Sequence, residues 1–257
     1  MRADMTAAMK RDHSHRPKLA PAVLALTLLV AGLIAGVTSR AEAGPNRAPQ
    51  IDVIGSGPLV WKQVVVRSRP TPASPRVAVL SQFRGNYRPQ YVLALAQRLD
   101  AEGLPSWYRV SVPGRPNGRK GWVRAEAVDI KPVEKRLIVY RGTRKFEFWD
   151  GKRLVRAGKV AVGKSGAETP LGLFYVTWKF NPRIDPEWAI LGAYAFETSA
   201  YSRLTDWPGG GIVGVHGTPW PELLGQAVSH GCVRLANENI TFLRSRVPLG
   251  TPVQIVR

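Results

Sequence analysis

Short runs of β-branched and aromatic residues, separated by Pro, Gly and Asn, recur along the chain from residue 59 to its end. Such runs are typical of strands joined by tight turns. The first group of runs occupies residues 64–66, 77–80, 107–110 and 121–123. The second group occupies residues 137–140, 145–149, 160–163, 173–178, 212–215 and 252–256. The pattern predicts a mainly β protein with two units, residues 59–132 and residues 133–257.

One helix is predicted near the end of the second unit. In residues 237–247 the apolar side chains of Ile240, Leu243 and Val247 fall on one helical face. Asn237 precedes them, and asparagine is a favoured N-cap residue because its side chain can accept a hydrogen bond from a free backbone N–H. We therefore expect a helix over residues 237–247 with Asn237 as its N-cap.

The first 43 residues have the features of a targeting segment. A basic stretch, residues 1–18, precedes an uncharged apolar run, residues 19–37, and Ala41-Glu42-Ala43 forms an A-x-A cleavage signal. We predict a secretory signal peptide that is cut after Ala43. The alternative is an uncleaved membrane anchor, because 19 helical residues extend about 28 Å, close to the thickness of a bilayer core. Both readings place the remaining chain outside the cytoplasm, in a periplasm or a cell wall.

Residues 44–58 are rich in Gly, Pro, Asn and Ser and predict a linker between the leader and the first unit. The chain of 257 residues has 37 Lys and Arg against 18 Asp and Glu. Without the leader, 31 basic and 15 acidic residues remain, a net charge of +16. Such a charge suits anionic partners, and export argues against nucleic acid, so we expect anionic wall polymers or a generally basic soluble protein.

The cysteine and histidine residues outside the leader are few and close together. Cys232 is the only cysteine, which excludes an intramolecular disulfide and a multi-cysteine zinc cluster. His216 and His230 precede it by 16 and 2 residues, whereas His13 and His15 lie in the leader. Cys232 is flanked by polar residues and glycine, an unusual setting for a buried apolar thiol. A thiolate nucleophile needs a nearby base, and imidazole supplies one at neutral pH.

The spacing favours His216 as the base, because a side chain from another strand can approach the sulfur directly. His230 is the alternative; on a strand it would point parallel to Cys232. Gly217 and Gly231 permit close backbone approach, and N–H groups around Gly231 and Cys232 are candidates for stabilising an oxyanion. Two other interpretations stay open: a zinc site made of both histidines and the cysteine, although no carboxylate has ligand-like spacing, and a purely structural cluster.

The strands of residues 59–132 resemble bacterial SH3-like domains, small barrels that often accompany cell-wall enzymes. The resemblance rests on residues 66–70, 107–110 and 121–123. It is interrupted within residues 89–103, where Tyr91, Leu95 and Leu99 recur at helical spacing and predict a helical insertion. The resemblance implies a module that either binds the wall or acts as a spacer.

The second unit resembles the L,D-transpeptidase catalytic (YkuD-type) family. The signature consists of His216-Gly217-Thr218-Pro219 followed, after a gap, by Ser229-His230-Gly231-Cys232-Val233-Arg234-Leu235. Residues 163–174, the helix after the signature and residues 247–253 agree with the family as well. The resemblance covers residues 137–257 and implies a β-rich catalytic domain with a few short helices.

The resemblance also implies roles for the matching residues. Cys232 would be the acyl-accepting nucleophile, and His216 would move the proton while the Gly217 carbonyl orients its ring. The residues that shape the site and its oxyanion hole would be Ser229, His230 and Gly231. Arg234 would bind a substrate carboxylate or, alternatively, hold the loop in place. Residues 181–211, rich in Pro, Gly and Trp, are expected to form a lid over the cleft.

The reaction that the resemblance implies is thioester acyl transfer on peptidoglycan stem peptides. The acyl group would pass to an amine, giving a cross-link, or to water, giving trimming. This chemistry requires no metal or other cofactor, and a membrane partner is expected only if the leader is uncleaved. Two alternatives remain, namely a sortase-like cysteine transpeptidase and a non-catalytic wall-binding protein.

Overall fold

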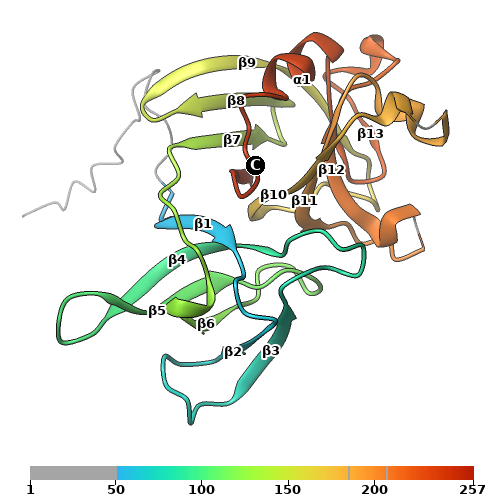
Figure 1. Ribbon diagram of the computed structural model, residues 1–257. Coiled ribbons are helices and arrows are strands. Elements are labelled where there is room, and N and C mark those ends of the chain that lie inside the picture. The colour runs from blue at the N-terminus through green and yellow to red at the C-terminus, as the bar shows by residue number, and fades with distance from the viewer. Residues whose placement is uncertain (1–50, 185, 207) are drawn as a thin grey trace, which may run out of the picture. The chain divides into compact units, whose positions relative to one another are not determined.

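The computed structural model describes residues 51–184, 186–206 and 208–257, which form two β-sheets (Figure 1). The predicted signal peptide or anchor and the first residues of the predicted linker, 44–50, lie outside the described residues. Within the described part of the chain, no helix is long and apolar enough to cross a membrane. The prediction of a mainly β protein is confirmed.

The first sheet has six strands in the order β1-β4-β5-β6-β2-β3. Its strands are β1 (Gly55–Pro58), β2 (Gln63–Arg67), β3 (Arg76–Ser81), β4 (Tyr91–Leu99), β5 (Pro105–Ser111) and β6 (Lys120–Arg124), followed by the 3-10 helix η1 (Ala125–Ala127). Strand β2 shows why the sequence pattern was informative. Val64 and Val66 are buried in the core while Val65 between them is exposed, the alternation expected of a sheet with one covered face.

Two predictions about this region are wrong. Residues 91–99 form β4 and not a helix, because β4 pairs with β1 on one side and β5 on the other and buries Val92, Leu93 and Ala94. The predicted linker also ends earlier, since β1 occupies its last four residues. Glycine is required there, because a Cβ at Gly57 would lie 1.7 Å from the Asp129 carbonyl oxygen. Composition predicted a linker here, whereas the close backbone approach fixes these residues in a strand.

The second sheet has nine strands in the order β13-β9-β14-β12-β11-β10-β15-β7-β8. Its strands are β7 (Lys135–Tyr140), β8 (Lys145–Asp150), β9 (Arg153–Gly163), β10 (Gly172–Phe180), β11 (Ala195–Tyr201), β12 (Ile212–His216), β13 (Ala227–Ser229), β14 (Val233–Leu235) and β15 (Pro252–Val256). Because β9 pairs with β8 as well as with β14, the sheet closes into a barrel-like ring. The apolar side chains inside it form one core cluster.

The helix α1 (Asn237–Leu243) packs on this core through Ile240 and Leu243, as the spacing predicted (Figure 1). It is shorter than expected, and its N-cap is Ala236, not Asn237. The Asn237 side chain bonds to other segments instead, as described below.

The predicted lid is interrupted by β11, which lies between β10 and β12 in the sheet. The short 3-10 helices of this region are η2 (Pro182–Ile184), η3 (Pro186–Leu191) and η4 (Pro208–Gly211), and a further one, η5 (Pro221–Leu223), follows β12. Only the segments before and after β11 are therefore loops in the sense that the composition indicated.

Candidate active site

The pairing of β12 with β14 brings the predicted histidine and cysteine together. The two strands are parallel, with Val215 opposite Val233. Cys232 lies immediately before β14, and its Sγ accepts a hydrogen bond of 3.3 Å from the Gly214 N–H. A Cβ built on Gly214 would lie 3.6 Å from His216 Cδ2 and 3.8 Å from Cys232 Sγ. The imidazole and the sulfur therefore both lie within 4 Å of the point where a Gly214 side chain would begin.

The His216 ring is held in one tautomer. Its Nδ1 lies 2.6 Å from the Gly217 carbonyl oxygen, which can only accept a hydrogen bond, so Nδ1 carries the hydrogen. Nε2 is then an acceptor, the form required of a general base. Burial lowers the pKa of His216 to about 4, although the carbonyls of Gly217 and Leu191 oppose this shift. The ring is therefore neutral at neutral pH.

The Cys232 thiol is also neutral at rest. Burial raises its pKa, while the Gly214 N–H and the positive charge of Arg234 lower it. The residue is nevertheless partly exposed. A neutral thiol beside a neutral imidazole acts by transferring its proton as the sulfur attacks.

A tight turn before Cys232 is closed by Ser229. Its buried Oγ donates to the Cys232 carbonyl at 2.6 Å and accepts from the Gly231 N–H at 3.2 Å. Gly231 has a φ of 121°, which side chains rarely permit. Because the Gly231 N–H is engaged with Ser229, the Cys232 N–H is the better candidate for an oxyanion donor.

His230 and Arg234 complete the set of sequence-predicted residues. His230 is partly exposed, and burial, followed by the charges of Lys164 and Arg234, lowers its pKa. The Arg234 guanidinium lies 5.8 Å from the centroid of the Trp220 ring. Its position on β14, opposite His216, is compatible with both predicted roles, carboxylate binding and support of the loop.

Two polar residues of the site were not predicted to hold it together. Thr169 Oγ1, fully buried, accepts from the Gly163 N–H and donates to the Gly231 carbonyl, both at 2.9 Å. Asn237 Oδ1 accepts from the Ala193 N–H at 2.8 Å and from the Thr218 N–H at 3.2 Å, and its Nδ2 donates to the Thr218 carbonyl at 2.8 Å.

Asn237 thus links the start of α1 to the segments before β11 and after His216. Its position directly after the signature was the available signal, but an asparagine before an apolar helix is read first as an N-cap. Among residues 51–184, 186–206 and 208–257, no group of three or more His, Cys, Asp or Glu side chains could hold a metal ion.

Comparison with known proteins adds to this geometry. A family model described as the L,D-transpeptidase catalytic domain matches residues 134–255. The chain is 30% identical over 155 residues to the Bacillus subtilis (strain 168) protein named as the L,D-transpeptidase YkuD. The alignment covers 60% of this chain and 79% of that protein. It is 34% identical over 120 residues to the Bacillus licheniformis protein of the same name, covering 47% and 64%. A solved L,D-transpeptidase from Mycobacterium smegmatis aligns with a TM-score of 0.42 and 18% identity, covering 65% of this chain and 90% of that chain.

Proposed function

Because the chain belongs to the L,D-transpeptidase catalytic-domain family, we propose that it transfers acyl groups between peptidoglycan stem peptides through a thioester on Cys232. One observation carries the proposal: the neutral His216 ring and the Cys232 sulfur lie 3.6 Å and 3.8 Å from the same point, the Cβ position at Gly214. A base in its acceptor tautomer beside a thiol is the arrangement that nucleophilic catalysis by cysteine requires.

In the first half of the reaction, His216 Nε2 takes the thiol proton while Sγ attacks the carbonyl carbon of the L-centred residue that precedes a terminal D-amino acid. The Cys232 N–H donates to the oxyanion. When the tetrahedral intermediate collapses, the bond to the D-amino acid breaks and its amine takes the proton from His216. The thioester remains on Cys232.

In the second half, a side-chain amine of a neighbouring stem attacks the thioester and gives its proton to His216. The Cys232 thiolate then leaves and takes this proton from His216, which gives a cross-link and restores the thiol. Water in place of the amine gives trimming. Arg234 supports both steps, because a guanidinium can bind a stem carboxylate in a bidentate manner. Ser229, His230 and Gly231 shape the turn that presents Cys232.

The setting we propose is the cell envelope, after export, with anionic wall polymers attracted by the basic surface. For residues 59–132, the SH3-like resemblance and a role in binding the wall or spacing the catalytic domain remain proposals. The domain boundaries at residues 43 and 132 are part of the same proposal, whereas the linker ends before β1.

The test is turnover of a tetrapeptide muropeptide by the full chain, with release of the terminal D-amino acid measured by chromatography. We expect release by the wild type and none by Cys232→Ala. His216→Ala should reduce release far more than His230→Ala. Equal losses in the two histidine variants would overturn the assignment of the base. A wild type that releases no D-amino acid would refute the transpeptidase proposal and favour the non-catalytic alternative, whereas cleavage of a sorting-signal peptide alone would favour the sortase-like one.

A further inference from the structure

A loop of the first sheet, between β5 and β6, contacts the end of β11 in the second sheet. Asn117 Nδ2 donates to the Tyr201 carbonyl at 2.7 Å, and its Oδ1 accepts from the Tyr201 N–H at 3.0 Å. This pair of bonds imitates the pairing of a neighbouring strand, so the Asn117 amide extends the sheet at the point where β11 ends.

Arg115 of the same loop holds the segment that follows β11. Its Nη2 lies 3.0 Å from the Ser202 carbonyl oxygen, 2.8 Å from that of Leu204 and 3.1 Å from that of Gly210. Its guanidinium also lies over the Tyr201 ring, 4.8 Å from the centroid. One cation therefore gathers three carbonyls that would otherwise have to be satisfied separately.

The segment held by this loop touches the turn that carries the nucleophile. Ser202 is 6% exposed, and a Cβ built on Gly231 would lie only 2.7 Å from Ser202 Cβ. The Ser202 side chain is thus packed directly against Gly231, one residue before Cys232. A shift of Ser202 would be transmitted to Gly231 because the contact leaves no free space.

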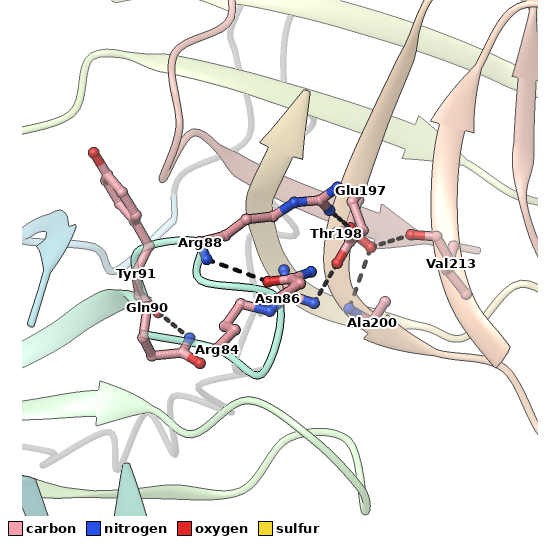
Figure 2. Close-up of polar contacts among 9 residues, drawn as sticks. All are labelled: Arg84, Asn86, Arg88, Gln90, Tyr91, Glu197, Thr198, Ala200 and Val213. Carbon is pink, nitrogen blue, oxygen red and sulfur yellow. Dashed lines mark hydrogen bonds and ion pairs between the residues drawn. The ribbon is translucent and has the colours of Figure 1, made fainter. Parts of the chain in front are cut away.

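A second loop of the first sheet, between β3 and β4, contacts β11 at Glu197, as Figure 2 shows. Arg84 and Arg88 both pair with Glu197, the Arg88 contact measuring 3.0 Å. Arg88 also lies over the Trp178 ring at 4.4 Å from its centroid. In the sheet Glu197 is opposite Gly214, whose N–H donates to Cys232 Sγ. Two loops of the first sheet therefore hold residues of the second sheet, Ser202 and Glu197, that lie next to Gly231 and Gly214.

We propose that the first sheet is part of the active site, and that Arg115 and Asn117 are positioning residues that fix the backbone around Gly231 and Cys232 for acyl transfer. The inference rests on the proposed function, because it concerns the oxyanion donor at Cys232. It gives the first sheet a role in the chemistry itself, separate from any role in wall binding.

Two reactions of the same thiol separate positioning from mere stability. Alkylation by iodoacetamide needs an accessible sulfur but forms no oxyanion, whereas acylation by p-nitrophenyl acetate forms one. We expect Asn117→Asp, which keeps the shape but loses the donor to Tyr201, and Arg115→Ala to slow acylation of Cys232 by about ten- to a hundredfold, the scale of a small misplacement. The alkylation rate should stay at the wild-type value. Arg98→Ala, at an exposed position on β4, is the matched control and should change neither rate.

Unchanged acylation in both variants would overturn the inference, as would a loss of acylation accompanied by faster alkylation, which signals general loosening of the fold. If thermal unfolding shows that Asn117→Asp is not folded, Arg115→Lys replaces it in the test. Lysine keeps the positive charge but lacks the planar guanidinium fork. A wild type that the ester does not acylate also overturns it. Muropeptide turnover is measured in parallel: its absence in the wild type refutes the proposed function alone, because the ester reports on the site without that substrate.

Discussion

Asn237 offers the sharpest test of how the site is held together. Its amide makes three hydrogen bonds, two accepted from the N–H groups of Ala193 and Thr218 and one donated to the Thr218 carbonyl. At about 1 kcal/mol each, their loss in Asn237→Ala costs about 3 kcal/mol. Alanine recovers about 0.5 kcal/mol through its higher helix propensity. We therefore expect the free energy of unfolding to fall by about 2.5 kcal/mol.

Chemical denaturation of the full chain measures this change. Asn237→Asp keeps the acceptor oxygen and should lose only about 1 kcal/mol, the donated bond. The matched control is Asn181→Ala, because Asn181 is exposed and accepts one bond from the Arg183 N–H, so its loss should stay within about 0.5 kcal/mol. Turnover should also fall in Asn237→Ala, since Thr218 follows the carbonyl that orients His216. A loss below about 1 kcal/mol in Asn237→Ala would show that these three hydrogen bonds do not stabilise the site.

Three further predictions concern the same site. Burial lowers the pKa of His216 to about 4, so the unfolded chain binds a proton before the folded chain does as the pH falls. The free energy of unfolding should therefore decline by about 3 kcal/mol between pH 6.5 and 4. His216→Gln should flatten this part of the profile of stability against pH. An equally steep profile in the variant would contradict the assignment. Thr169→Val removes bonds to Gly163 and Gly231 and should cost about 2 kcal/mol in denaturant while slowing turnover; unchanged values would show that the hydroxyl does not hold the turn. Gly231→Ala places a methyl group against Ser202 at a positive φ and should abolish turnover, and near-normal activity would contradict the tight packing.

The strands of the core were predictable because their side chains alternate or form continuous apolar runs, as in β2 and β12. Strand β14 was not predicted, because it has only three residues and its existence depends on pairing with β12 and β9. The same is true of β11, whose Glu, Thr and Ser residues give no clear strand pattern. In residues 91–99 the spacing of three apolar residues suggested a helix. These residues form β4 instead, because they pair with β1 on one side and with β5 on the other.

The candidate site divides in a similar way. His216 and Cys232 could be identified from the sequence because cysteine and histidine are rare residue types in this chain. The glycines that flank them are also distinctive. The residues that hold them could not, because each acts across a long separation in sequence. Thr169 reaches a residue 62 positions away, and the Asn237 amide reaches one 44 positions away. Asn117, in the other sheet, is separated from its partner by 84 positions. Local pattern carries no information about such contacts.

The proposed acyl carrier is Cys232, and the decisive experiment is to follow the intact mass of the protein during reaction with a tetrapeptide muropeptide. We expect a transient adduct whose mass equals that of the muropeptide minus the released D-amino acid, located on the peptide that contains Cys232 and absent from Cys232→Ala. Release of the D-amino acid without such an adduct, or an adduct that persists in Cys232→Ala, would contradict this role of Cys232.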